Sequence, residues 1–266
     1  MPKPILWFAH CRNFANSGDM ASCPYWPLRD YFRENFDRRF IDISDKLPYE
    51  GDKISENDFL IVGGGGLDGY HDVWHKRINT MAKKAKKAVL WGVGSNRDPK
   101  RQLKALDQID QSLFCLVGLR DFGYKYVPCS SCLNIEEDVF KIEASKNCGL
   151  VHHLDASFNC SEVPANCDVI CNSQSYERIF TFIREHRFII TDSFHICYWS
   201  QLLERPVYRL HSNGTDSRFI GMKYQVPNWT GSRNSEAEKV YPGFWKECVE
   251  INLSFFEKVK KEFASA

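Results

Sequence analysis

The sequence predicts an α/β protein that folds into two Rossmann-like lobes followed by a C-terminal helix. Short apolar runs alternate with longer amphipathic segments along most of the 266 residues, which is typical of parallel sheets covered by helices. An acidic and lysine-rich stretch over residues 134–147 interrupts this alternation. We therefore expect an N-terminal lobe over residues 1–140, a C-terminal lobe over residues 141–235 and a closing helix within residues 236–266.

The first lobe is expected to begin with a strand and to alternate from there. The apolar run at residues 59–62 ends at four consecutive glycines and is therefore a short strand. Residues 71–87 place Val73, Ile78 and Met81 roughly on one face, which predicts a helix. The expected strands lie over residues 5–9, 40–43, 59–62, 88–93 and 113–118, and the expected helices over residues 25–36, 71–87 and 100–109.

The second lobe repeats the pattern after the interruption. The expected strands lie over residues 150–153, 187–191 and 206–210, and the expected helices over residues 175–185, 195–203 and 242–263. Ligands of such sheets bind beyond the carboxyl ends of the strands. The loops that follow strands are therefore where a functional site is expected.

Net charge and hydropathy argue against a nucleic-acid partner and against a membrane-spanning segment. The net charge of +1 argues against a nucleic-acid partner, which would need a strongly basic face. The N-terminus has no signal-peptide pattern, and no stretch approaches the roughly 18 apolar residues of a membrane span. These features predict a cytoplasmic protein.

The 11 cysteines are expected to be free thiols, as in a reducing compartment. Cys129 and Cys132 have the spacing of half a zinc site, but no second half follows at zinc-finger distance. A redox role is not favoured, because redox pairs of this spacing usually open a helix after a strand. We expect neither a bound metal nor a cofactor.

Polar and glycine residues follow two of the expected strands. Asn16, Gly18 and Asp19 come shortly after the first strand, where Asp19 suits a sugar hydroxyl or acid–base work. The same residues also fit an Asx-type turn that caps the next helix. Gly64 and Gly65 stand between a strand and a helix, where they could present N–H groups to an anion or form a tight turn between lobes.

Two arginines follow later strands of the first lobe. Arg97 lies with Gly94 in a second, weaker glycine loop. Arg120 follows a strand terminus, where a guanidinium suits bidentate binding of a carboxylate or phosphate. An ordinary surface pair between Arg120 and Asp121 is the alternative.

A further group of polar residues stands between a strand and a helix in the second lobe. Asp192, Ser193 and His195 lie at the expected helix N-terminus, where the dipole favours an anion by roughly 0.3–1 kcal/mol. A histidine there can become charged near neutral pH and pair with phosphate or carboxylate. Asp192 or Ser193 also fits a helix N-cap.

Taken together and in this order, these segments resemble the polysaccharide pyruvyl transferase family, from about residue 5 to about residue 220. The resemblance is carried by Asn16-Ser-Gly-Asp19, residues 63–66, Gly92-Val-Gly94, Arg120-Asp121, residues 127–133, Ile190-Thr-Asp-Ser-Phe-His195 with Leu202-Leu-Glu-Arg-Pro-Val-Tyr208, and Asn213-Gly-Thr-Asp-Ser-Arg218. Some members carry an arginine where this chain has Ser193. Arg97, Arg120 or Arg218 could supply that charge instead.

The resemblance implies a GT-B-like pair of lobes and the transfer of a pyruvyl group from phosphoenolpyruvate to a hexose. The product would be a ketal on a bacterial surface polysaccharide, such as a capsule or exopolysaccharide, or on its membrane-bound, lipid-linked precursor, which the protein would contact peripherally. In the expected mechanism Arg120 and His195 hold the anionic donor, His195 is the acid and Asp19 the base. Asp192 is a further candidate for the catalytic set.

Two other functions fit the same sequence features. A nucleotide-sugar-dependent glycosyltransferase of GT-B type would use the glycine loops and helix ends for a diphosphate. A member of the family with Ser193 in place of arginine could also bind glycan without turnover.

Overall fold

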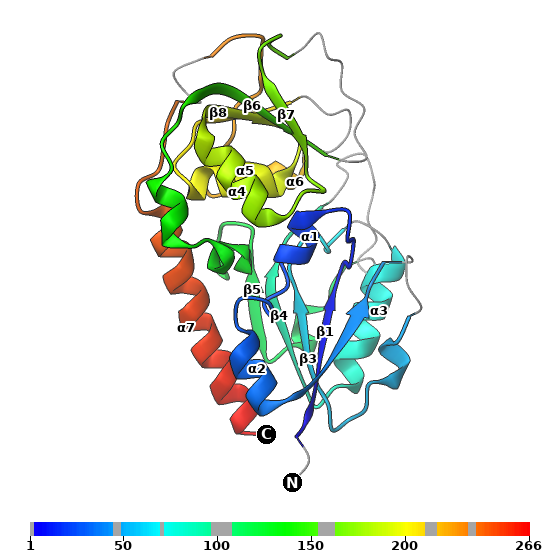
Figure 1. Ribbon diagram of the computed structural model, residues 1–266. Helices are drawn as coiled ribbons and strands as arrows, with labels where there is room; N and C mark the ends of the chain where they lie inside the picture. The colour runs from blue at the N-terminus through cyan, green and yellow to red at the C-terminus, as the bar shows by residue number, and fades with distance from the viewer. Residues whose placement is uncertain are drawn as a thin grey trace.

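The protein forms two separate parallel sheets, seen in a computed structural model that describes residues 3–44, 49–69, 72–96, 108–153, 163–210, 217–233 and 238–266 (Figure 1). Apolar side chains from both sheets and from the helices beside them form the buried core. The helix expected over residues 100–109 lies almost wholly outside the described residues.

The first sheet has the strand order β2-β1-β3-β4-β5, and all its pairs are parallel. Its central strands are buried apolar runs, as a parallel sheet covered on both faces requires. The strands are β1 (Ile5–His10), β2 (Asp37–Asp42), β3 (Phe59–Gly63), β4 (Lys87–Val93) and β5 (Leu116–Leu119). The last strand starts later than expected, because Gln111–Leu113 forms a 3-10 helix, η3, in front of it.

The second sheet has the order β7-β6-β8-β9 and is also parallel throughout. Its strands are β6 (Lys146–His152), β7 (Asp168–Cys171), β8 (His186–Thr191) and β9 (Val207–Arg209). The edge strand β7 was not expected from the sequence. The linking stretch over residues 134–147 contributes the 3-10 helix η5 (Glu137–Lys141) and the start of β6.

Helices stand beside both sheets. The α-helices are α1 (Ser17–Ala21), α2 (Arg29–Asn35), α3 (Asp72–Lys84), α4 (Tyr176–Glu185), α5 (Phe194–Leu202), α6 (Ser217–Ile220) and α7 (Phe244–Ala264), with short 3-10 helices η1 (Gly51–Lys53) and η4 (Ser130–Asn134). Every residue of α5 is buried. A helix that is apolar on all sides belongs in a protein core, and α5 packs there with α4 and the start of α7.

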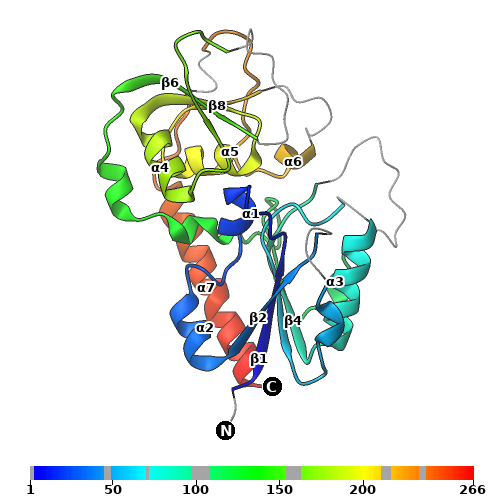
Figure 2. The same ribbon diagram turned by 45° about the vertical axis from the view of Figure 1, so that its right-hand side comes forward.

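The C-terminal helix α7 touches the cores of both halves of the molecule (Figures 1 and 2). Its first turns place Phe244 and Cys248 in the core beside the second sheet. Its last turns place Phe256 and Phe263 against the first sheet. This helix therefore joins the two cores.

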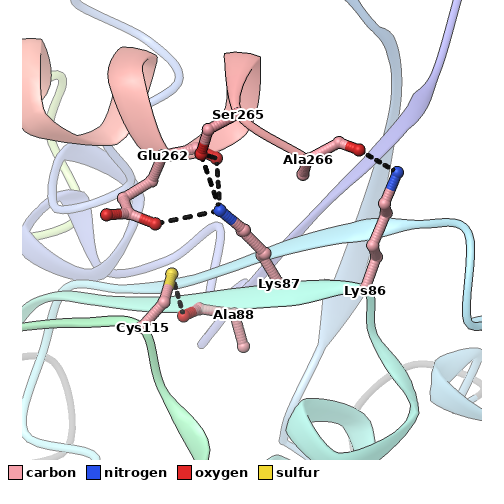
Figure 3. A network of polar contacts seen from close by, with 7 residues as sticks. All are labelled: Lys86, Lys87, Ala88, Cys115, Glu262, Ser265 and Ala266. Atoms are coloured by element: carbon pink, nitrogen blue, oxygen red, sulfur yellow. Dashed lines mark hydrogen bonds and ion pairs between the residues drawn. The ribbon is translucent and has the colours of Figure 1, made fainter.

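Lys86, just before β4, and Lys87, its first residue, bind the C-terminal end of the chain after and within the last turn of α7 (Figure 3). The Nζ of Lys87 donates to the carbonyl of Glu262 at 2.7 Å and to Ser265 Oγ at 2.9 Å, and it pairs with the Glu262 carboxylate at 3.0 Å. The Nζ of Lys86 donates to the carbonyl of Ala266 at 2.6 Å. Cations at a helix C-terminus satisfy carbonyls that have no partner within the helix and complement its dipole.

One pair of cysteines differs from the expectation that all are free thiols. Cys148 on β6 and Cys167 just before β7 form a disulfide, with their Cα atoms 4.7 Å apart. The pairing of β6 with β7 brings the two residues together. Cys129 and Cys132 are both free thiols and both buried.

Within the described residues, no helix combines the length and the apolar character that a membrane crossing needs.

Candidate functional site

Both sheets change winding direction at their first strand, and the polar loops lie at those points. The order of the first sheet reverses between β1 and β3, and that of the second between β6 and β8. In open parallel sheets, ligands bind at such a switch point, beyond the carboxyl ends of the strands. Asn16 follows β1 and the glycine run follows β3, while His153 follows β6 and Asp192 follows β8.

Residues from both switch points line one cavity of about 300 Å³. Its walls combine cationic, imidazole, carboxylate and amide groups with a few apolar side chains. The lining residues are Cys11, Asn13, Asn16, Asp19, Ser44, Gly66, Leu67, Trp74, Asn96, Arg120, His153, Ser193, Phe194 and His195.

Asn16 caps α1 and also reaches the second sheet. Its Oδ1 accepts the N–H of Gly18 at 3.1 Å, so the Asx-type cap is present. The same oxygen accepts from Asn172 Nδ2 at 3.3 Å, and the Nδ2 of Asn16 lies 3.3 Å from Nε2 of His153. One side chain thus joins the loops that follow β1, β6 and β7.

The imidazole of His195 lies directly against Gly18. A Cβ atom placed on Gly18 would overlap the ring at Cγ and Nδ1. His195 is only 6% exposed, and its Nε2 lies 3.8 Å from Sγ of Cys129. The absence of a side chain at Gly18 is what allows α1 and α5 to approach with the histidine between them.

Asp192 is buried and does not line the cavity. Its Oδ1 accepts the backbone N–H of His153 at 2.7 Å, which fixes the loop after β6. Ser193 is the N-cap of α5 but makes no side-chain cap hydrogen bond, and it does line the cavity. Asp192 therefore supports the wall to which Ser193 and His195 belong.

Arg120 lies in a slot made by two glycines and one aromatic ring. Its guanidinium carbon is 3.7 Å from the centroid of the Phe194 ring, which is a cation–π contact. A Cβ on Gly94 would overlap the arginine side chain, and one on Gly66 would come within 3.0 Å of its Nη2. The side chain is 4% exposed and still lines the cavity, so it presents a cation there with little exposure to bulk water.

Asp19 brings a carboxylate to the cavity from the first turn of α1. The carboxylate lies next to the glycine run, 3.9 Å from the position that a Cβ on Gly65 would take. Burial, together with the nearby Asp19 and Asp42 carboxylates, raises the pKa of the Cys11 thiol far above its usual range. Cys11 is therefore a neutral thiol in the cavity wall.

The glycines act by close packing and not by offering every N–H group to a ligand. The N–H of Gly64 donates to the carbonyl of Trp91 at 3.0 Å, and that of Gly94 donates to Gly65 at 3.0 Å. Both N–H groups are thus used inside the protein, which fits the tight turn that was the alternative expectation for the loop after β3. The positive φ angles of Gly64 (75°) and Gly65 (81°) explain why the turn needs glycine.

The structure gathers most of the sequence-predicted residues at one place. Asn16, Asp19, Arg120, Ser193 and His195 line the cavity, and Gly18, Gly65, Gly94 and Asp192 lie directly behind this lining or beside it. Arg97 lies outside the described residues, and Arg218 is placed in α6 without a described side chain. Among the described residues, no group of three or more His, Cys, Asp or Glu side chains is arranged to hold a metal ion.

Several lining residues were not singled out from the sequence as site residues. His153 is the clearest, because it follows the apolar run of β6 at the switch point of its sheet. The rule that led to Asn16 would have found it, had the strand order been known. Trp74 and Ser44 reach the cavity only through the packing of α3 and of the loop after β2, which the sequence pattern does not reveal.

Comparison with known proteins gives a likeness of fold. No protein-family model matches this chain, and no curated protein matches it. A candidate UDP-N-acetylglucosamine 2-epimerase from Listeria monocytogenes has a similar structure, with a TM-score of 0.52 and 9% sequence identity over 95% of this chain and 90% of that chain. A functionally uncharacterized protein from Klebsiella pneumoniae subsp. pneumoniae gives a TM-score of 0.46 at 16% identity, over 82% of this chain and 86% of that chain. The likeness to the Listeria structure is one of overall α/β fold.

Proposed function

We propose that this protein transfers a pyruvyl group from phosphoenolpyruvate to a hexose of a surface polysaccharide or of its precursor, forming a ketal. One observation carries the proposal: Arg120, His195 and Asp19 line the same cavity. An anionic donor needs a cation, and its transfer to a hydroxyl needs an acid and a base. The motifs that resemble the pyruvyl transferase family contribute these three side chains.

The proposal includes a GT-B-like arrangement of two lobes, with residues 1–140 as the first, residues 141–235 as the second and the remaining residues closing the structure. The meeting of two sheet switch points at one cavity supports it. The donor and the acceptor would enter the cavity between the lobes.

Arg120 is the residue that we assign to the anionic groups of the donor. Its guanidinium lies over an aromatic ring and between glycines, so its direction is fixed before a ligand arrives. A preorganised fork suits a carboxylate or a phosphate, since both offer two oxygens in a plane. His153 and His195 supply further N–H donors from the opposite sheet.

The reaction joins a sugar hydroxyl oxygen to C2 of phosphoenolpyruvate. The methylene carbon gains a proton, the bond between C2 and the phosphate oxygen breaks, and a second hydroxyl of the same hexose completes the ketal as its proton leaves with phosphate. His195 gives the proton to the methylene carbon, and Asp19 takes the proton of the attacking hydroxyl. Each such transfer contributes typically about 10²–10⁴-fold to the rate.

The cavity volume favours a small donor. About 300 Å³ is at the lower end of the range of roughly 300–1,000 Å³ that ligand pockets occupy. The second candidate function is a nucleotide-sugar-dependent glycosyltransferase. It is favoured because the Listeria protein of similar fold is named for an activity on a nucleotide-sugar. A glycan-binding protein without turnover is the third.

Replacement of His195 tests the proposal. His195→Ala should lower the release of phosphate from phosphoenolpyruvate, with a galactoside or mannoside acceptor, by at least about 10²-fold. His195→Gln is the matched variant: its amide keeps a hydrogen-bond donor but supplies no proton, so donor affinity by calorimetry should recover while turnover does not.

Near-normal turnover of a folded His195→Ala protein would contradict His195 as the acid. It would leave Asp19 as the candidate, because Asp192 does not line the cavity. Ligand-dependent melting separates the three functions. Phosphoenolpyruvate should raise the melting temperature under the main proposal, a nucleotide-sugar under the second, and neither under the third.

A further inference from the structure

A series of hydrogen bonds leads from the buried indole of Trp199 on α5 to His195. The indole Nε1 of Trp199 donates to Ser131 Oγ at 2.9 Å, and Ser131 Oγ donates to Cys129 Sγ at 3.2 Å. Cys129 Sγ in turn lies 3.8 Å from Nε2 of His195. All four side chains are buried, and Trp199, Ser131 and Cys129 are at most 1% exposed, so bulk water has little access to these contacts.

The direction of the chain is set by its first member. An indole N–H can only donate, so Ser131 must accept from Trp199 and use its own proton for Cys129. The sulfur of Cys129 then accepts on one side. Its own proton is left to point toward Nε2 of His195.

Cys129 carries that proton at neutral pH. Burial raises the pKa of its thiol, against the opposing effects of Ser131 and the Arg120 charge. The residue is also fixed in place, because the hydroxyl of Tyr198 donates to its backbone carbonyl at 3.1 Å. The sulfur therefore reaches the imidazole as a protonated and rigidly placed donor.

We propose that Cys129 is a positioning residue that holds His195 in its neutral tautomer with the proton on Nδ1. If Nε2 accepts the S–H of Cys129, the single proton of the neutral ring must be on the other nitrogen. That nitrogen lies against Gly18, on the side of α1 whose first turn carries Asp19. The ring thus presents an N–H group toward the cavity-lining helix.

The tautomer follows from the hydrogen-bond geometry together with the protonated thiol of Cys129, whereas its consequence for catalysis rests on the proposed function. In the ligand-free protein the neutral His195 ring keeps its N–H on the side of α1, and the other charged or titratable groups that line the cavity are Cys11, Asp19, Arg120 and His153. A second proton on Nε2 would require the Cys129 sulfur to accept, and thiol sulfur is a weak acceptor. Cys129 therefore opposes charging of His195 until a bound donor anion favours it.

Nitrogen NMR on the full chain with ¹⁵N-labelled histidine tests the tautomer without any assay of activity. The His195 signals are identified by their loss in His195→Gln, at about pH 8, above the usual histidine pKa of about 6.5. We expect a protonated Nδ1 and an unprotonated Nε2 in the wild-type protein. A wild-type spectrum with the proton on Nε2 would overturn the proposal, whether or not any variant folds.

Variants at two cysteines of one motif separate the specific effect from general loosening. Cys129→Ala should shift the His195 nitrogen signals toward the Nε2–H form. Cys132→Ala removes an equally buried thiol whose sulfur contacts Asn252, and it should leave those signals unchanged. Identical spectra of Cys129→Ala and the wild type would contradict the positioning role.

The catalytic consequence is measured separately. Cys129→Ala should lower kcat for phosphate release from phosphoenolpyruvate by about tenfold, because the ring loses the contact that keeps a proton on Nδ1. This loss is a part of the roughly 10²–10⁴-fold that a general acid contributes. Donor affinity should stay within about twofold, because an N–H donor remains available on the ring. Absence of any turnover in the wild type would reject the proposed function and leave the tautomer to the NMR result.

Discussion

At the scale of single residues, Gly18 decides how close α1 can come to the imidazole of His195. A methyl group at this position would occupy the space of the ring, so Gly18→Ala must displace His195. Displacement of a catalytic group by about 1 Å can cost about 10² in rate. We therefore expect Gly18→Ala to reduce phosphate release from phosphoenolpyruvate by about that factor.

The stability of the Gly18→Ala variant separates a local from a global effect. Gly18 is the second residue of α1, where alanine is the better helix former by at most about 1 kcal/mol, so only part of the steric cost is offset. Gly123→Ala is the matched control, because nothing lies within 4 Å of a Cβ placed there. Full activity of Gly18→Ala would mean that His195 does not need its present position.

The sequence predicted residues of the cavity lining most successfully where several polar residues follow the same strand. Asn16 and Asp19, or Ser193 and His195, are such pairs, and all four line the cavity. His153 stands alone after its strand, and a lone histidine carries no pattern of its own. Its place became visible only once the order of β6 and β8 was known.

At the scale of elements, the apolar runs of β1, β3, β4 and β8 were predictable, because strands buried on both faces need continuous hydrophobic sequence. The edge strand β7 was not predicted, because Asp168 and Val169 are exposed and the strand is short. The five-residue α1 also escaped, because its helix is defined by the Asn16 cap and by packing, and not by a hydrophobic period.

One buried amide adds polar contacts to the packing of α7 against the first sheet. Asn252 accepts the indole N–H of Trp91 at 2.8 Å and donates to the carbonyl of Pro128 at 3.2 Å. Asn252→Leu leaves both buried groups without this partner, at about 1–3 kcal/mol each. We expect the free energy of unfolding in urea to fall by roughly 2–6 kcal/mol.

The neighbouring position on the same helix provides the control. Leu253 is 43% exposed, so Leu253→Ala should change the free energy of unfolding by no more than about 0.5 kcal/mol. If Asn252→Leu and Leu253→Ala have equal effects, the indole contact contributes nothing to the docking of α7.

In the molecule as a whole, both sheets reverse their strand order at their first strand. Contacts at the cavity and along α7 join the two sheets. Asn16 connects the loops of both sheets, and α7 belongs to both cores. Destabilisation of either sheet should therefore alter the geometry of the cavity. Acid should destabilise the first sheet, because His10 is buried at the end of β1.

His10 should make the folded protein sensitive to mild acid. The side chain is 1% exposed, and burial, followed by the charge of Arg12, lowers its pKa from 6.5 to about 4. Between these two values the unfolded chain binds a proton that the folded protein does not, so stability is lost as the pH falls from about 6.5 and levels off near 4. For this one group the loss of free energy of unfolding between pH 7 and pH 5 is about 2 kcal/mol.

Urea unfolding at pH 7 and pH 5 measures this loss. In His10→Gln, which keeps an amide donor but does not titrate, the decline should be smaller by about that amount. An equal decline in the wild type and His10→Gln would show that His10 is not the group that couples acid to unfolding.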